Sequence, residues 1–114
     1  MCKDKDKVRL QHMLDAAVKA IEFTKVRKRE ELDKDELLAL ALVRLLEILG
    51  EAAKGVSVPT RNKFPAIPWK SIAGTRDRLI HGYYDVDLNI VWKIITEDLP
   101  ALKTQLEKLL AKRP

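Results

Sequence analysis

The sequence predicts an all-α protein, an antiparallel bundle of four to five helices, and three observations carry this prediction. Apolar residues recur at helical spacing along most of the chain. No stretch alternates between apolar and polar residues as a half-buried strand does. Glycines, prolines and acidic residues stand where such helices would begin or end. With 114 residues, 46% of them hydrophobic, the chain has the size of a single domain, 1–114.

A first helix is predicted from about Asp4 or Asp6, either of which could cap it, to Thr24. Steps of four, three and four residues separate its apolar positions, which are Leu10, Leu14, Ala17 and Ile21. The charged segment 25–31 then continues the helix as a solvated end or forms a turn. We interpret it as a helix end.

A second helix is predicted over 34–54, because Asp33 and Glu36 have the spacing of a capping box and Gly55 follows the last apolar turn. Apolar residues surround most of this helix, and one polar stripe interrupts them: Arg44, Glu47, Glu51 and Lys54. So apolar a helix must be covered on nearly all sides. Self-association, or a central position among the other helices of one subunit, would provide that cover.

The C-terminal half has three further predicted helices. Residues 56–68 hold three of the five prolines and are expected to form an irregular, packed connection. A third helix should begin at Trp69 and stop before Gly82. Asp87 is the expected cap of a fourth helix, and Asp98 with Pro100 the expected start of a fifth.

The charge of the chain is concentrated in one part of the sequence. Residues 54–81 hold six basic residues against Asp77 alone, which accounts for the whole net charge of +5. A sequence pI of 9.4 together with this concentration favours an anionic partner. The single cysteine, the charged N-terminal region and the lack of an apolar run of ~20 residues predict a cytoplasmic protein without membrane segments.

Arg76 conflicts with the apolar pattern of the predicted third helix. At 100° per residue it falls among Trp69, Ile72, Ala73, Leu79 and Ile80. An unpaired guanidinium would be costly to bury there. Arg76 should therefore pair with Glu47 or Glu51, or face a cleft that an anion enters.

His81 lies about 140° from Arg76 around an ideal helix, so the two side chains do not share a face. A frayed last turn or a second copy of the helix across a dimer could bring them together. In the last helical turn the imidazole would meet the negative end of the helix dipole, which favours its protonated form and proton donation. A helix-capping or surface histidine is the structural alternative.

Other candidates for chemistry are less well supported by their neighbours. Asp85 and Asp87 have a spacing used for divalent metals, but turn and cap roles explain them as well. His12 has no second ligand at a metal spacing. The sequence holds no phosphate-binding glycine loop and no zinc pattern. We therefore expect neither a metal nor a cofactor.

Arg76, His81 and Tyr83 form an Arg-x4-His-x-Tyr pattern, with Asp77 directly after the arginine. This pattern resembles the HEPN superfamily, in particular the HepT-like toxins of two-gene toxin-antitoxin systems. Three further segments resemble that family and extend the likeness over most of the chain: 46–54, 67–69 and 86–100.

The resemblance implies a metal-independent ribonuclease that acts as a homodimer on an RNA substrate, with the motifs of both subunits in one cleft. It also implies a cognate nucleotidyltransferase antitoxin of the MNT type, which adenylylates the motif tyrosine, here Tyr83. In this interpretation Arg76 and His81 are catalytic. The supporting or RNA-binding residues would be Arg61, Lys63, Lys70, Asp77 and Arg78.

Two other hypotheses remain open at this stage. The chain could be a non-catalytic HEPN-like module that binds RNA or a nucleotide in the same basic cleft. It could also be a structural subunit whose basic segment contacts a nucleotidyltransferase-like partner. Product formation from RNA in the presence of EDTA separates the first alternative from a ribonuclease.

Overall fold

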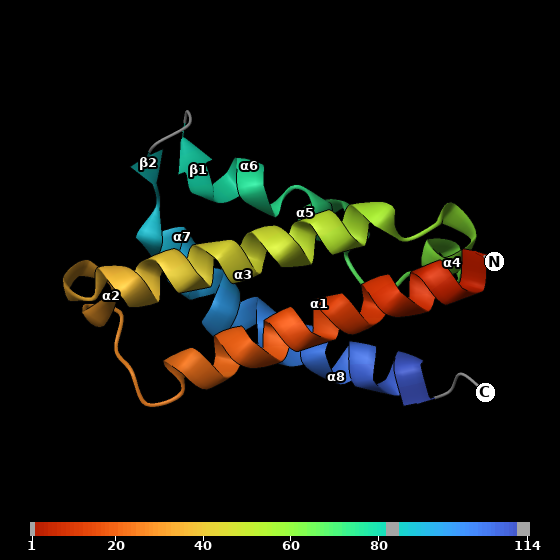
Figure 1. Cartoon of the computed structure of the whole chain (residues 1–114), viewed down its shortest axis with the longest axis horizontal. Coiled ribbons are helices and arrows are strands. Elements are labelled where there is room, and N and C mark those ends of the chain that lie inside the picture. Colours follow the sequence, from red (N-terminus) through yellow and green to blue (C-terminus); the bar gives the residue numbers. More distant parts are fainter. Residues whose placement is uncertain (1, 82–84, 112–114) are drawn as a thin grey trace.

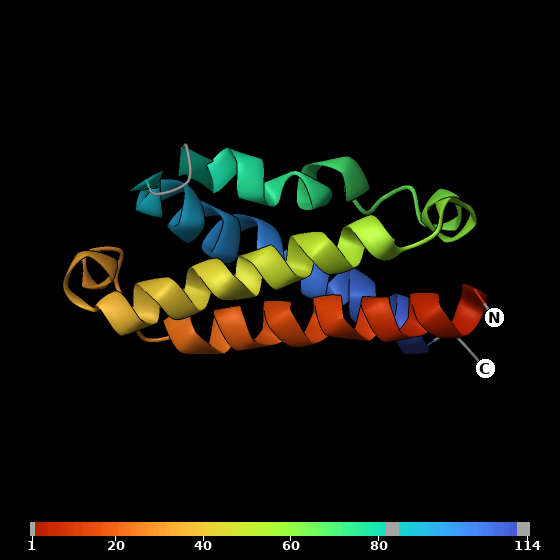
Figure 2. The same ribbon diagram turned by 45° about the horizontal axis from the view of Figure 1, so that its top comes forward.

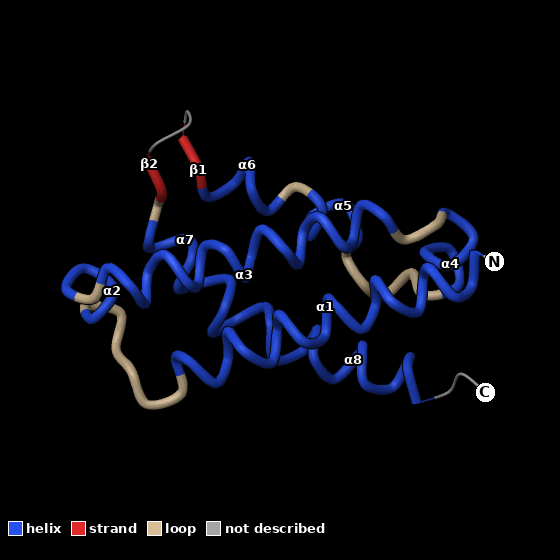
Figure 3. Tube along the Cα trace, in the orientation of Figure 1, coloured by secondary structure: helices blue, strands red, loops and turns tan. Residues whose placement is uncertain are grey.

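The computed structural model describes residues 2–81 and 85–111 and confirms the predicted all-α class. The helices are α1 (Cys2–Thr24), α2 (Glu31–Lys34), α3 (Glu36–Gly55), α4 (Val58–Lys63), α5 (Trp69–Ala73), α6 (Thr75–Leu79), α7 (Leu88–Lys93), the π-helix η1 (Ile94–Asp98) and α8 (Leu99–Ala111). Two short strands, β1 (Ile80–His81) and β2 (Asp85–Val86), pair in antiparallel fashion. Figure 3 shows how little of the described chain lies outside helices.

The core lies between the long helices. Helix α1 packs along α3 on one side and along α8 on another, and α5 lies on the opposite flank of α3 (Figures 1 and 2). The apolar positions predicted from periodicity supply the contacts, and the fully buried ones include Leu10, Met13, Ala17, Leu42, Leu46, Leu49, Leu106 and Leu109. The predicted first and second helices are thus confirmed.

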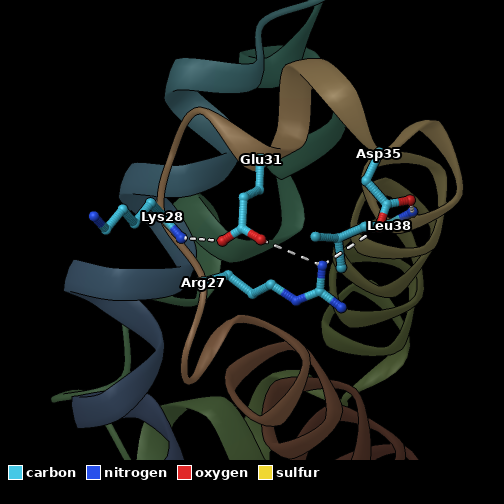
Figure 4. A network of polar contacts seen from close by, with 5 residues as sticks. All are labelled: Arg27, Lys28, Glu31, Asp35 and Leu38. Carbon is cyan, nitrogen blue, oxygen red and sulfur yellow. Dashed lines mark hydrogen bonds and ion pairs between the residues drawn. The ribbon is translucent and has the colours of Figure 1, made fainter.

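The segment between the first two long helices is a turn and not the helix end that we expected. Helix α1 stops at Thr24, and Arg27 then lies between two carboxylates, 3.7 Å from Glu31 and 3.4 Å from Asp35 (Figure 4). Asp35, not Asp33, caps α3, because its Oδ1 accepts a hydrogen bond from Leu38 N at 3.0 Å. Three charged side chains, those of Arg27, Glu31 and Asp35, thus pair with one another in this turn.

Helix α3 is packed against α1 on one side and α5 on the opposite flank, but part of its surface is exposed near its N-terminal end. Its expected polar stripe is present, with Arg44 Nη1 3.7 Å from Glu47 and Lys54 Nζ 3.9 Å from Glu51. Toward its N-terminal end Leu37 is 83% and Leu40 61% exposed. The cover that we expected from the other helices of one subunit is therefore incomplete at this end of α3.

The proline-containing connection after α3 is packed, as predicted, and contains α4. A buried carboxylate fastens it to α1: Asp6, 2% exposed, accepts hydrogen bonds from Ser57 N at 2.9 Å and from the hydroxyl of Thr60. Ile67, also buried, adds an apolar contact. Trp69 then begins α5, and its Nε1 donates to Phe64 O at 3.0 Å.

The predicted third helix is broken in two at Gly74, which ends α5 and precedes α6. Glycine is about 1 kcal/mol less favourable than alanine in a helix interior. Because of this break, the side chains of α6 point in directions that differ from those that one continuous helix would give them. Helix α6 ends at Leu79, and Ile80 is already extended with φ −110° and ψ 120°.

The last two predicted helices are continuous. Asp87 caps α7 as expected, since its Oδ1 accepts from Asn89 N at 3.0 Å and from Ile90 N at 3.2 Å. Asp98, expected to cap a new helix, instead lies in η1, which runs directly into α8. Pro100 gives the reason, because it has no N–H and its ring clashes with the carbonyl four residues earlier. The turn widens, and Leu99 N–H donates to Ile94 O.

Gly50 allows α5 to approach α3 closely. A Cβ at this position would lie 3.1 Å from Ile72 O, a carbonyl that also accepts from Thr75 Oγ1 at 2.7 Å. We expect Gly50→Ala to destabilise the protein by about 1–3 kcal/mol through overpacking, despite a gain of up to about 1 kcal/mol in helix propensity. Urea unfolding of the full chain measures the difference.

Gly55→Ala is the matched control in the same helix. There the three atoms nearest to an added Cβ all belong to the side chain of Arg9, which can move aside, so a change within about 0.5 kcal/mol is expected. Equal destabilisation by the two substitutions would show that backbone contact between α3 and α5 is not what requires Gly50.

Candidate active site

Helix α6 presents three consecutive charged residues to solvent: Arg76, Asp77 and Arg78. Its two ends, Thr75 and Leu79, are buried. They are four residues apart and so lie on one face of the helix, which packs on α3 and α7. The burial of both ends turns the charged middle of the helix outward.

Arg76 forms an ion pair with Glu47 of α3, one of the two partners that the sequence predicted. Arg76 Nε lies 3.3 Å from Glu47 Oε2, and Arg44 Nη1 lies 3.7 Å from the other oxygen. Arg76 is 64% and Glu47 24% exposed. The expected place of Arg76 in the middle of an apolar face is wrong, because the break at Gly74 rotates it out of that face. Its guanidinium is accessible to an anion from solvent.

Arg78 points to a different side of α6. Its Nη1 donates to Ser71 Oγ at 3.3 Å, and its side chain lines a cavity between α5, α6 and the η1–α8 helix. Two residues along a helix correspond to about 200° of rotation, which explains why Arg76 and Arg78 diverge. The motif helix therefore offers one arginine toward α3 and another toward α8.

His81 lies in a strand and not in the last turn of a helix, which corrects the prediction. β1 pairs with β2 so that Ile80 faces Val86 and His81 faces Asp85, and Asp87 N donates to Leu79 O at 2.7 Å. His81 therefore lies outside the helical turn whose dipole we expected to favour its protonated form. The side chain of His81 and the whole of Tyr83 lie outside the described residues, so whether they meet Arg76 stays a prediction.

The other predicted basic residues are spread along one edge of the molecule. Lys70 is exposed on α5, Lys63 is exposed on α4, and Arg61 is half-buried there. Helix α4 lies near the N-terminal end of α1, whereas α6 adjoins β1 much farther along the long axis (Figure 1). The basic segment 54–81 is thus continuous in sequence but does not form one compact patch.

Within residues 2–81 and 85–111, no group of three or more His, Cys, Asp or Glu side chains is placed to hold a metal ion. No helix there is long and apolar enough to cross a bilayer. Asp87 has the cap role that the sequence suggested as the alternative to metal binding.

Sequence reasoning missed the acceptors and donors on the α8 side of the cavity. Glu97 and Asp98 line it from η1, and Gln105 lines it from α8. No local signal marks them, because they reach the cavity only through the packing of η1 and α8 against segment 66–78. The sequence predicts Asp98, with Pro100, as the start of a fifth helix and indicates no role for Glu97.

The fold defines a class of helical proteins in which Arg76, the first residue of the Arg-x4-His-x-Tyr segment, is exposed on a short helix. Within that class, the chain belongs to the family described as ribonuclease HepT-like, whose profile matches residues 13–109. The matched range contains Arg76, His81 and Tyr83 and every element from α2 to η1.

Several relatives support this assignment over nearly their whole length. A Methanocaldococcus jannaschii protein named "Putative RNase" is 39% identical over 107 residues, which cover 94% of this chain and 98% of the relative. One of the same name from Caldanaerobacter subterraneus subsp. tengcongensis is 42% identical over 103 residues, 90% and 92% of the two chains. A "Probable ribonuclease HepT" from Thermococcus cleftensis is 39% identical over 100 residues, 88% and 91% of the two. No solved structure matches the chain significantly.

Proposed function

We propose that this chain is the toxin of a two-gene toxin-antitoxin system, an endoribonuclease that cleaves RNA without a metal ion. Membership of the HepT-like ribonuclease family is the observation that carries the proposal. The exposed guanidinium of Arg76 supports it, because a substrate phosphate can reach that group from solvent. Arg76 and His81 are the proposed catalytic residues.

The chemistry requires only proton transfer and charge stabilisation. The 2′-hydroxyl oxygen attacks the adjacent phosphorus, the bond from phosphorus to the 5′-oxygen breaks, and a cyclic phosphate and a 5′-hydroxyl result. A base takes the proton from the 2′-hydroxyl and an acid gives one to the leaving oxygen, and His81 fills one of these roles. Arg76 stabilises the negative charge that develops on the non-bridging oxygens.

A homodimer formed through the exposed face of α3 fits this scheme. Leu37, Leu40, Arg44 and Glu47 follow one another at steps of three, four and three along that face. A groove of about 330 Å³, which includes Leu40, Val43 and Leu88, continues it toward β2. Arg76 lies beside Glu47 at the edge of the same face. A partner subunit on this face would therefore adjoin both copies of the motif segment.

The proposed antitoxin is a nucleotidyltransferase of the MNT type that transfers AMP to Tyr83. The phenol oxygen attacks the α-phosphorus of ATP, pyrophosphate leaves, and the phenolic proton is lost. The product adds bulk and negative charge two residues from His81, which would exclude RNA by sterics and repulsion.

The full chain is expected to cleave single-stranded RNA in excess EDTA and to lose this activity after incubation with the antitoxin, ATP and Mg²⁺. Mass spectrometry should then locate one AMP on Tyr83. Tyr83→Phe should keep cleaving RNA after the same treatment, whereas Tyr84→Phe, the matched control, should be modified and inactivated.

Other results of this experiment would contradict parts of the proposal. RNA binding without any product in EDTA would favour the non-catalytic binding module. Modification of Tyr84, or of no tyrosine, would contradict the proposed mode of neutralisation while leaving the ribonuclease assignment intact.

A further inference from the structure

A cavity of about 300 Å³ lies between the motif helix and the C-terminal helix, within the size range of small-molecule sites. Its floor is apolar and is formed by Leu49, Ile72, Ile94, Leu99 and Leu102. Its rim is polar, and Arg78 contributes to it from α6. A flat, partly apolar group with polar edges would fit such a site.

The rim carries charges of opposite sign that do not neutralise each other. Arg78 stands on one side of the cavity, and Glu97 and Asp98 stand on the other. Within the ranges 2–81 and 85–111, Arg78 donates to Ser71 Oγ and forms no ion pair with either carboxylate. All three charged side chains are exposed. The cavity can thus offer one cation and two acceptors to a bound molecule.

The π-helix η1 places the two carboxylates there. The missing N–H of Pro100 widens this turn, and the wider turn carries Glu97 and Asp98 at the rim while Ile94 enters the floor. Single π-turns inside α-helices are uncommon and frequently occur at functional sites. The π-turn η1 therefore forms part of the wall of the cavity.

A second hollow of about 270 Å³ continues the first. The two share Ala66 and Gln105, and Gln105 Nε2 donates to Ala66 O at 3.2 Å across the boundary between them. Lys63 and Lys108 line the second hollow. The two neighbouring hollows, together called the trough below, offer one cation in the first hollow, two in the second and apolar surface in both. A single-stranded nucleic acid needs this alternation, because its phosphates seek cations and its unstacked bases seek apolar surface.

We propose that this trough binds the single-stranded RNA substrate beside the cleavage site and that its first hollow selects guanine. The inference rests on the proposed ribonuclease function and adds a base preference to it. Guanine carries a ring N–H next to an amino group, and both can donate to one carboxylate of Glu97 or Asp98. Uracil offers a single N–H between two carbonyl oxygens, which a carboxylate repels. Arg78 would hold the adjoining phosphate.

The position of the trough relative to the motif supports this assignment. Arg78 belongs to the same five-residue helix as Arg76 and stands three residues before His81. Arg76 and Arg78 project from opposite sides of this helix, so a strand whose phosphate is held by Arg78 would cross the helix to reach Arg76. Glu97 and Asp98 would then be specificity-determining residues for a nucleotide beside the cleaved one.

The test measures fluorescence anisotropy of labelled hexanucleotides with the full-length His81→Ala variant, which should bind without cleaving. An oligo(U) strand with one central guanine should bind about tenfold more tightly than oligo(U) itself, within the range of one bidentate base contact. The double substitution Glu97→Gln and Asp98→Asn should remove this difference. Glu107→Gln, which neutralises a carboxylate of the same helix outside the trough, should preserve it.

The arms of the experiment separate the possible failures. A guanine preference that survives the double substitution, or no preference in any strand, overturns the inference even if the wild-type chain cleaves RNA. Lys63→Ala and Lys108→Ala should each weaken all strands alike and lower the salt dependence by about one phosphate contact. If GMP binds as tightly as the guanine strand and the lysine substitutions change nothing, the cavity binds a free nucleotide and not RNA. Absence of both cleavage and RNA binding rejects the proposed function together with the inference.

Discussion

His81→Ala is expected to lower the initial rate of RNA cleavage by about 10²- to 10⁴-fold, the contribution usual for a general acid or base. Without the imidazole, the proton must come from or go to water, which is neither positioned nor matched in pKa. The fold should not change, because the contribution of residue 81 to the pairing of β1 with β2 is made by its backbone. Cleavage of end-labelled RNA on denaturing gels gives the rate, and circular dichroism checks the helices.

His12→Ala provides the matched control. His12 is exposed on α1, and its replacement removes the same side chain without touching the motif. Both variants should unfold at the wild-type temperature. If His81→Ala retains wild-type activity in a preparation free of other nucleases, proton transfer belongs to another group and the catalytic assignment is wrong.

Arg76→Ala is expected to reduce cleavage by about 10²- to 10³-fold, as the loss of one group that stabilises transition-state charge does. The change in stability should be less than about 1 kcal/mol, because the ion pair with Glu47 is exposed to solvent. Arg76→Lys should restore part of the activity, since it returns the charge without the planar pair of donors. Single-turnover rates together with urea unfolding measure both effects.

Arg44→Ala tests whether the position of the Arg76 charge matters or only the net positive charge of the protein. Arg44 pairs with the other oxygen of the same glutamate and is equally exposed to solvent, so its loss changes the net charge by the same amount. Arg44 also lies on the proposed dimer face, so we expect less than a threefold change in the cleavage rate of Arg44→Ala once size-exclusion chromatography has shown that it has the same oligomeric state as the wild type. Equal losses in Arg44→Ala and Arg76→Ala would mean that Arg76 acts only through general attraction for RNA.

The parts of the fold that were predictable from the sequence are those that local periodicity determines. The apolar stripe of α1 and the cap at Asp87 require only neighbouring residues, and both are present. The helix predictions were wrong where a single residue interrupts the helical spacing of the apolar residues. Gly74 divides the predicted third helix, and Pro100 joins the fourth and fifth through a π-turn where a break was expected.

The candidate site was partly predictable for the same reason. Glu47 was one of two expected partners of Arg76, because the polar stripe of α3 was evident from spacing alone. The outward direction of the Arg76 side chain was not predictable, because it depends on how the break at Gly74 rotates α6 relative to α5. The trough was inaccessible to sequence reasoning, because Ala66 and Gln105 meet across 39 residues of chain.

The division of the third helix at Gly74 also affects local stability. Helices α5 and α6 have five residues each, far below the ~12–15 at which an isolated helix becomes marginally stable in water. Their helical form thus exists only while they are packed on the rest of the bundle. Exchange of their amide hydrogens reports opening of this packing and can occur without global unfolding. The segment that carries Arg76 therefore keeps its shape through the burial of Trp69, Ile72 and Leu79 in the core and not through its own helix propensity.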